Sequence, residues 1–158
     1  MALLVLCTSV AQADDTVELN DQQGRYILGK HISYLADETG QLTIKDVIKP
    51  EVGKRFISSD FDIPNFGFSS TPYWVRVNLV YKAHLHQADK DWLIEVFYPL
   101  FDSVEMYIAD NNGEYRVSRM GDGMPFGMRE INHANLLFPF TTEPGVPQTV
   151  YFRFATQG

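Results

Sequence analysis

The sequence contains little cysteine, few basic residues and no long apolar run beyond its N-terminus. Cys7 is the only cysteine among 158 residues, which excludes disulfides within the chain and metal sites built from several cysteines. Thirteen Lys and Arg stand against twenty Asp and Glu, and the net charge of −7 leaves no cationic surplus for binding nucleic acid. No later stretch reaches the roughly 18 apolar residues that a membrane-spanning helix requires.

What the chain does contain is enough apolar material for a packed globule. Hydrophobic residues make up 45% of the sequence and aromatic residues 13%, so the chain can bury a core instead of staying disordered. Its length suits one domain. No internal repeat and no low-complexity tract is visible, and we therefore expect a single folded unit.

The N-terminus has the pattern of a secretory signal. Residues 2–7 are apolar (ALLVLC), and residues 11–13 (AQA) have the small-x-small form of a signal-peptidase site. We predict an export signal over 1–13, an N-terminal extension with short strands over 14–40, and a sandwich domain over 41–158. A buried N-terminal segment stays open as the alternative, because the positively charged start of a signal is missing.

Apolar and polar residues alternate along most of the chain after Pro72. The segments predicted as strands on this pattern are 73–82, 92–98, 104–109, 114–119, 134–140 and 149–155. Turn residues separate them, and Asn111, Asn112 and Gly113 predict a hairpin between two of them. Many short strands joined by turns predict an all-β fold, a jelly-roll or Greek-key β-sandwich.

The chain before Pro72 carries weaker signals. Residues 25–28 and 32–35 are predicted as short strands. We expect at most one short helix, near 43–48, which Thr43 would cap and Pro50 would end.

In each of four predicted strands, alternate residues fall into two sets, which we call the parities of the strand. One parity is apolar, and the other holds one aromatic and one charged residue. The pairs are Trp74 with Arg76, Glu95 with Phe97, Glu105 with Tyr107, and Tyr151 with Arg153. Residues two apart on a strand share a face, so these strands, if joined in one sheet, would present all four pairs together. Rings stack on the C–H faces of sugars, while Arg and Glu bond to hydroxyl groups. This face is therefore predicted to bind a carbohydrate or a similar small polar ligand.

Other roles for the same residues stay open. Opposite charges on neighbouring strands stabilise a sheet by roughly 0.2–1 kcal/mol per pair, and the rings could pack beneath a loop or a neighbouring subunit. A protein-interaction or dimerisation module would use the same face or a free sheet edge. A glycan-cleaving enzyme is the remote alternative, because arginines near Glu95 and Glu105 would keep both carboxyls ionised and leave no general acid.

The remaining polar motifs predict no cofactor and no metal site. His84 and His86 share a parity, but they lie in a polar loop without a third ligand. The glycine-rich stretch 121–127 does not open a helix after a strand, so it is not a phosphate-binding loop. Within it, Asp122 is expected to bond to the backbone or to Arg129, with a place at the mouth of the ligand site as the alternative.

A series of short motifs follows in a recognisable order. They are NFG at 65–67, YWVRV at 73–77, WLIEVFYPLFD at 92–102, VEMY at 104–107, GDGMPF at 121–126 with Arg129 after it, and VYFRF at 150–154. From about Gln41 onward the chain resembles the type 2 extracellular domain of bacterial seven-transmembrane receptors with diverse intracellular signalling modules.

This resemblance implies a jelly-roll β-sandwich similar to carbohydrate-binding modules, placed outside the cytoplasmic membrane. Membrane contact would come only through downstream helices absent from this chain, with a cytoplasmic signalling module beyond them. The domain would be a non-catalytic sensor of a small molecule, often suggested to be a carbohydrate. The positions that match the family pattern are Trp74, Arg76, Gly121, Asp122, Arg129, Tyr151 and Arg153.

The resembling family usually adds another strand after the position of Gly158. The domain is therefore expected to lack its last strand, either as a trimmed domain or as a natural fragment. An open sheet edge of this kind invites pairing with another chain, so a homodimer is a further expectation.

Overall fold

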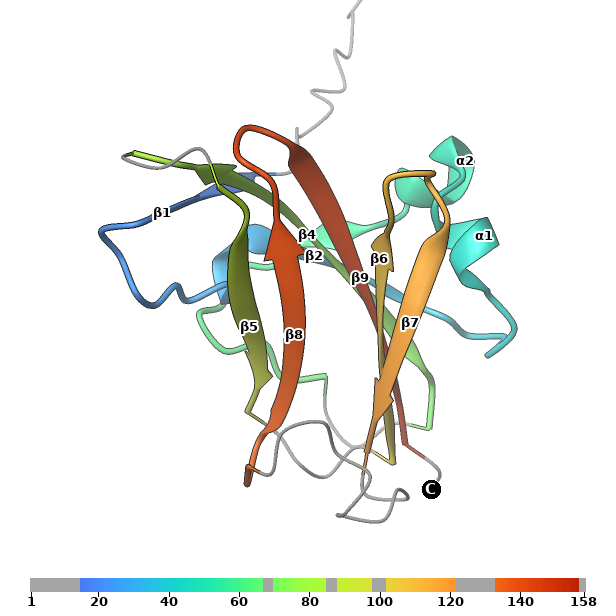
Figure 1. Ribbon diagram of the computed structural model, residues 1–158. Helices are drawn as coiled ribbons and strands as arrows, with labels where there is room; N and C mark the ends of the chain where they lie inside the picture. Colours follow the sequence, from blue (N-terminus) through green and yellow to red (C-terminus); the bar gives the residue numbers. More distant parts are fainter. Residues whose placement is uncertain (1–14, 67–69, 85–87, 98–101, 122–132, 157–158) are drawn as a thin grey trace, which may run out of the picture.

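The structure is a computed structural model that describes residues 15–66, 70–84, 88–97, 102–121 and 133–156. The expected signal segment, Asp122 and Arg129 lie outside the described residues. Regular structure in the described part is mostly strand, with three short helical turns (Figure 1).

Nine strands are found among the described residues. They are β1 (Thr16–Asn20), β2 (Ile32–Ala36), β3 (Ile57–Ser58), β4 (Tyr73–Lys82), β5 (Lys90–Val96), β6 (Ser103–Ala109), β7 (Tyr115–Met120), β8 (Leu136–Thr142) and β9 (Pro147–Ala155). The last six begin and end within two residues of the predicted segments, because alternation is strong there. Residues 25–28, expected as a strand, instead lead into the 3-10 helix η1 (Gly29–His31).

The strands form two layers. The large sheet has the order β3-β2-β4-β9-β6-β7, and β1 pairs in parallel with the second half of β4. β2 pairs with the first half of β4, so β1 and β2 lie along the same edge of that long strand. β5 and β8 form a separate antiparallel pair that lies across the large sheet (Figure 1). The predicted all-β sandwich is confirmed.

The main core fills the space between the layers. Its buried side chains include Val75, Val77 and Leu79 of β4, Val104 and Met106 of β6, Val150 and Phe152 of β9, Ile94 of β5, and Leu136 and Phe138 of β8. Burying an apolar side chain of this size stabilises the fold by about 1.5–3 kcal/mol. This core therefore supplies the main force that holds the two sheets face to face.

Two short α-helices, α1 (Ile44–Val47) and α2 (Pro50–Gly53), lie between β2 and β3. The prediction of at most one helix is wrong, because Pro50 begins a second helix as well as following the first. Proline suits the first turn of a helix, where its missing N–H would have no partner. Thr43 and Asp46 form the capping box that starts α1.

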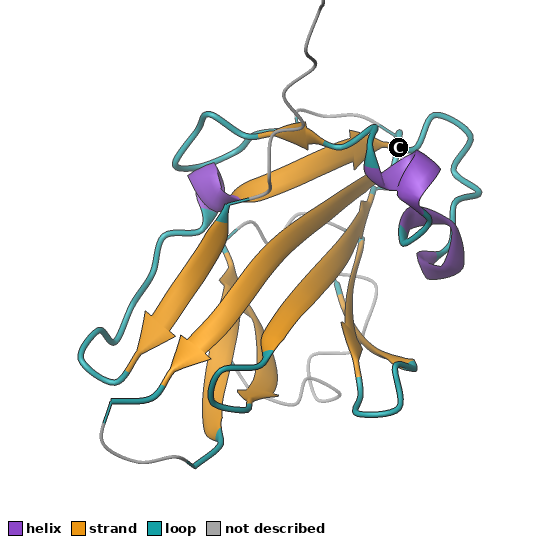
Figure 2. Ribbon diagram, turned by 90° about the horizontal axis from the view of Figure 1, so that it is seen from above, coloured by secondary structure: helices purple, strands orange, loops and turns teal. Residues whose placement is uncertain are grey.

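Residues 37–56, which we call the cap, fold over one face of the large sheet. The buried carboxylate of Asp37 accepts hydrogen bonds from the Thr39 hydroxyl at 2.9 Å and the Leu42 N–H at 3.0 Å. A carboxylate is costly to bury without such donors, so these bonds direct the chain from β2 into α1. Figure 2 shows both helices on the same side of the sheet.

Candidate functional site

Three of the four predicted aromatic–charge pairs lie side by side on one face of the large sheet. Two rows cross this face: Trp74, Arg153 and Glu105 form one, and Arg76, Tyr151 and Tyr107 form the other. The side chains of these three strands share a face as the alternation predicts, because residues two apart on a strand point the same way.

The cap covers the part of this face that carries Trp74 and Tyr151. Trp74 is fully buried and Tyr151 is only 8% exposed. They pack with Leu35 of β2 and Val47 of α1 in a second, smaller core. The expectation of an open aromatic platform is therefore wrong for these two rings, which pack beneath a covering segment instead.

Arg76 ties the cap to the sheet. Its Nη1 donates a hydrogen bond to the Gly53 carbonyl at 3.1 Å, and its guanidinium lies 4.4 Å from the centroid of the Phe56 ring. Such a cation–π contact contributes about 0.5–2 kcal/mol. Among the residues that the structure describes, the buried indole Nε1 of Trp74 has no hydrogen-bond partner, and an unpaired buried donor costs about 1–3 kcal/mol. Both residues thus have structural roles under the cap.

The part of the face beyond the cap is half-exposed, and its charges pair with one another. Glu105 accepts hydrogen bonds from the Tyr107 hydroxyl at 2.7 Å and from Nε of Arg119 at 2.6 Å. Burial and the bond to Glu105 raise the pKa of Tyr107 to about 12, and the same carboxylate raises the pKa of Arg119. Arg153 donates to the Gly40 carbonyl at 3.4 Å. Much of the bonding capacity here is already used within the fold.

Glu95 and Phe97 lie on the other layer. Glu95 is in β5 and Phe97 follows that strand, so their expected place beside Trp74 is wrong. Alternation shows which residues share a face of one strand, but not which strands share a sheet. Glu95 accepts a hydrogen bond from Nδ2 of Asn135 at 2.6 Å, and Phe97 is 72% exposed. Because Glu95 and Glu105 point outward from opposite layers, they do not flank a common bond as glycosidase carboxylates do.

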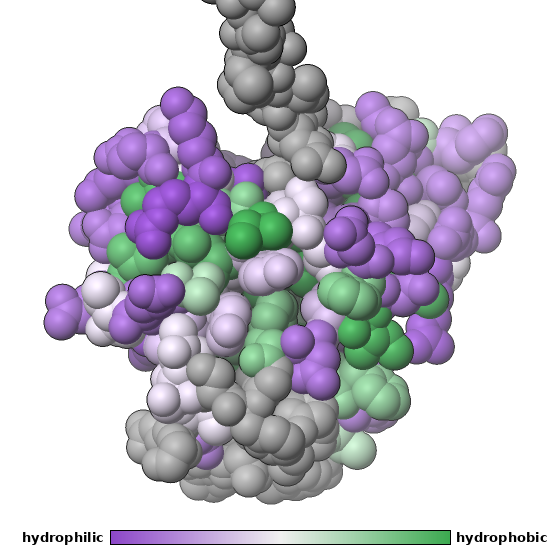
Figure 3. Space-filling model, turned by 180° about the vertical axis from the view of Figure 1, so that it is seen from behind, coloured by the Kyte–Doolittle hydropathy of each residue, from purple (hydrophilic) through white to green (hydrophobic). Residues whose placement is uncertain are grey.

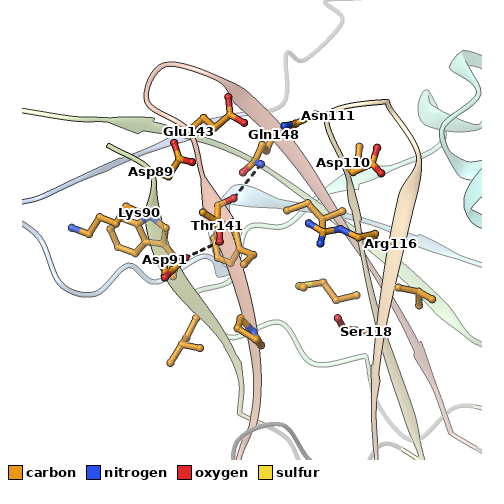
Figure 4. Close-up of a pocket in the computed structure, with 18 of the residues that line it drawn as sticks. Asp89, Lys90, Asp91, Asp110, Asn111, Arg116, Ser118, Thr141, Glu143 and Gln148 are labelled. Atoms are coloured by element: carbon orange, nitrogen blue, oxygen red, sulfur yellow. Dashed lines mark hydrogen bonds between the residues drawn. The ribbon is translucent and has the colours of Figure 1, made fainter. Parts of the chain in front are cut away.

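An open concave surface, which we call the β7–β8 groove, extends from the loop after β1 across β5 and β8 to β7 (Figure 4). Its volume is about 1270 Å³. It opens because the second sheet, two strands wide in the described residues, stops short of β7. Side chains of the buried core, among them Met106 and Ile108, line its base.

Polar groups from both walls line this groove. Arg116 and Ser118 face inward from β7, whereas Asp91 and Thr141 lie on the outward face of the second sheet, at the rim. Arg116 and Ser118 share the inward parity of β7 and point towards β8 (Figure 4). On the other wall, Asp91 accepts a hydrogen bond from the Thr141 hydroxyl at 2.7 Å, and the Thr141 carbonyl accepts one from Gln148 at 3.3 Å. Arg116 is exposed and takes part in none of the ion pairs among the described residues. Its guanidinium points into the groove, where it can donate hydrogen bonds to a ligand (Figure 4).

The free edge of β8 is poorly suited to pairing with another strand. The Thr141 carbonyl bonds to Gln148 and so points away from β5, and alternation gives Pro139 the same orientation. Proline has no N–H to donate to a new neighbour. An added strand would also bury Arg116, an inward-pointing charge of the kind that protects sheet edges. This edge therefore borders an open surface.

A hydrogen-bonded network stiffens one wall of the groove by joining β1, β4 and β5. Asp21, just after β1, accepts hydrogen bonds from the Tyr81 hydroxyl at 2.7 Å and from Nζ of Lys90 at 3.0 Å. These bonds lower the pKa of Asp21 to about 2, and the bond to Asp21 raises the pKa of Tyr81 to about 12. Lys90 also lies 4.7 Å from the ring centroid of Trp92.

Sequence reasoning missed the residues of this groove. Arg116 and Ser118 share a parity with Met120, which is buried in the core. The sequence does carry one signal for the groove. A charged guanidinium among the residues of β7 that point inward indicates that the second sheet does not cover β7 at that position. The contribution of Thr141 and Gln148 depends on strand pairing and has no comparable local signal.

The comparison with family models matches most of the chain. The model of the 7TMR-DISM extracellular 2 family covers residues 29–158. The chain belongs to this family. The match begins before Gln41, where the motif resemblance begins, and it takes in β2 and the cap. The comparison with curated proteins and the comparison with solved structures give no match.

Membership of the 7TMR-DISM extracellular 2 family gives the location of this domain. The family is an extracellular domain of seven-transmembrane receptors, so the domain is exported and lies on the periplasmic side of the inner membrane in the receptor. A sensor role fits this position. Of the helices in the described ranges, none is long and apolar enough to cross a membrane. Those ranges also contain no group of three His, Cys, Asp or Glu placed to hold a metal ion.

Proposed function

We propose that this 7TMR-DISM extracellular 2 domain senses a neutral polyhydroxylated ligand, a carbohydrate, in the β7–β8 groove. The observation that carries the proposal is the groove itself, with Arg116 and Ser118 on one wall and Asp91 and Thr141 on the other. The ligand class is the one that the sequence predicts, but its site moves away from the Trp74 face because the cap covers that face. The role is binding without catalysis.

The charges of the groove favour hydroxyl groups over a simple ion. A sugar hydroxyl donates and accepts hydrogen bonds at once, so the hydroxyls of one ligand can accept from the guanidinium and donate to the carboxylates that line the groove. Five carboxylates and two basic side chains line the groove, so its net charge is negative and would repel an anion. A neutral polyol avoids this repulsion and can accept hydrogen bonds from Arg116, which a cation cannot do.

Apolar side chains lie beside the polar groups of the groove. Leu93, which is 53% exposed, and Pro139 line it next to Asp91 and Thr141. Such mixed walls suit a sugar, whose C–H faces need apolar contacts while its hydroxyls need donors and acceptors. The volume of about 1270 Å³ exceeds that of most small-molecule pockets. We infer that the groove accommodates a short oligosaccharide and not only a single ring.

Thermal unfolding in the presence of a panel of neutral and acidic glycans tests this proposal. A neutral glycan is expected to raise the melting temperature, because only the native state binds it. Arg116→Ala should weaken binding by about 10- to 100-fold, as the loss of a charged hydrogen bond does, and so remove most of the rise. Arg55→Ala is the matched control, since it removes an exposed arginine of the cap.

The outcomes of this test are distinct. A rise that needs Arg116 and tolerates Arg55→Ala supports the groove. A rise that survives Arg116→Ala but disappears in Tyr107→Phe would locate the ligand on the predicted sheet face and refute the groove as the site.

A further inference from the structure

Basic side chains are concentrated on the helical part of the cap, residues 43–55. This segment holds four of the thirteen Lys and Arg residues but only two of the twenty Asp and Glu residues. It is therefore positive within a chain whose net charge is −7. The four basic residues are all exposed, and they are Lys45, Lys49, Lys54 and Arg55. Together with Ile48, which lies between them in the sequence, we call them the cap patch.

The cap patch faces away from the sheet that the cap covers. Val47 is fully buried, and Val52 packs in the second core. Lys45 and Lys54 each lie two residues from one of these valines, and two residues turn an α-helix by about 200°. Figure 2 shows both helices standing out from one side of the sheet, and Figure 3 shows strongly hydrophilic side chains gathered over the cap at the upper left. These lysines therefore point into solvent.

Most of the charge of the cap patch is not compensated nearby. Lys45, Lys54 and Arg55 take part in none of the ion pairs in the described part of the chain. Lys49 donates a hydrogen bond to Asp46 at 2.9 Å, so one of the two carboxylates of the segment is already neutralised. The patch thus presents net positive charge at the surface.

Ile48 adds an apolar group to these charges. It is 42% exposed, and it lies three residues after Lys45, on the same side of the helical turn. An exposed apolar side chain among lysines is typical of protein surfaces that lie at a bilayer, because the apolar group enters the acyl boundary while the ammonium groups contact phosphates. Lysine acts as a point charge without fixed geometry, which suits a fluid array of headgroups.

We propose that the cap patch docks on the anionic phospholipids of the membrane beside this domain. The domain lies on the periplasmic side of the inner membrane in the receptor, so a lipid surface is close to it. Anionic headgroups attract each Lys or Arg near the surface and repel the rest of this acidic domain, so the cap turns towards the membrane.

This lipid contact is additional to the downstream membrane helices that the family resemblance implies. It does not depend on the ligand of the β7–β8 groove. Core side chains form the base of that groove, whereas the cap lies on the opposite face of the large sheet. A failure of one proposal therefore leaves the other standing.

Co-sedimentation of the full chain with lipid vesicles tests the docking. The chain is expected to bind vesicles made of phosphatidylglycerol and phosphatidylcholine in equal parts, and to bind vesicles of phosphatidylcholine alone at least about 10-fold less. Lys45→Glu and Lys54→Glu should each weaken binding to the anionic vesicles by about 10- to 30-fold, because each change removes one attraction and adds one repulsion.

Lys82→Glu is the matched control for these two variants. Lys82 is exposed at the end of β4, whereas the cap covers Trp74 near the start of that strand. The change in net charge is the same, but binding should weaken by no more than about 3-fold, because salt screens a charge this far from the contact.

The apolar part of the contact has its own pair of variants. Ile48→Asp should weaken binding to the anionic vesicles by about 10-fold or more, because a carboxylate then replaces the side chain that enters the bilayer. Val146→Asp should leave binding nearly unchanged. Val146 is 43% exposed, as Ile48 is to within one per cent, but it lies in the turn between β8 and β9.

The lipid proposal is wrong if the chain does not bind anionic vesicles, if it binds both kinds of vesicle alike, or if Lys82→Glu weakens binding as much as the cap variants do. Polyglutamate separates a lipid surface from an acidic protein partner. If immobilised polyglutamate retains the chain through Lys45 and Lys54 while anionic vesicles do not, the partner is an acidic polypeptide and the lipid proposal is overturned. Circular dichroism spectra check that each variant is folded.

Discussion

Trp74 and Arg76 lie on the same side of β4, and each holds the cap in a different way. The indole fills the second core against Val47, whereas the guanidinium reaches Gly53 and Phe56. At the scale of the residue, an aromatic and an ion on one parity of a strand therefore indicate a covered face in this molecule. The same composition on an open strand would suit a sugar, and sequence alone does not separate the two.

Replacing Trp74 by alanine should destabilise the fold by about 3–5 kcal/mol, because it empties a fully buried site. Phe97→Ala, at a position that is 72% exposed, should change the free energy of unfolding by no more than about 0.5 kcal/mol. Urea unfolding followed by circular dichroism measures both variants. Similar small losses in the two variants would show that Trp74 is not buried under the cap.

At the scale of the element, the strands and the covering segments differ in how far the sequence predicts them. β4 to β9 follow from alternation over six residues or more, since each strand has one face in the core. α1 and α2 are four residues long, which is too short for helical periodicity to appear. The cap seals its face through Val47 and Trp74, residues far apart in the sequence, so its role follows only from the folded structure.

The candidate site was predictable to the same limited extent. Three aromatic–charge pairs share a face as their parities require, but β5 alternates like β6 and still belongs to the other layer. The β7–β8 groove exists because two sheets of unequal width meet, and no local pattern specifies that width. Only Arg116 indicates this width from the sequence, because it is a charged residue on the inward parity of β7.

The contact between β1, β4 and β5 should make stability depend on pH in acid. Asp21 has its pKa lowered from 3.8 to about 2 by its bonds to Tyr81 and Lys90, so the unfolded chain binds this proton first as pH falls. The stability that the carboxylate contributes is therefore complete above about pH 4 and is lost towards pH 2.

Melting temperatures of the original chain and of Asp21→Asn, measured between pH 5 and pH 2, test this contact. The variant should have a lower melting temperature than the original chain at pH 5. Its melting temperature should also fall less between pH 5 and pH 2. Asp21→Asn should still lose some stability in acid, because Thr43 and Lys49 hold the pKa of Asp46 below its usual value as well. Parallel curves for the two proteins would show that Asp21 is not bonded to Tyr81 and Lys90.

At the scale of the whole molecule, the large sheet carries one closed and one open surface. The cap closes one face over Trp74, and the β7–β8 groove opens beyond the narrow second layer. Under the proposed function, a ligand can therefore occupy the groove while the cap stays closed over Trp74.

The two tryptophans make the central claim directly measurable. Trp92 lines the groove, while Trp74 lies under the cap, and each gives one indole N–H signal in a nitrogen–proton correlation spectrum. Titration with a glycan that raises the melting temperature is predicted to shift the Trp92 indole signal and leave that of Trp74 in place. A shift of the Trp74 signal with Trp92 unchanged would contradict the account, because the ligand would then act at the face that the cap seals.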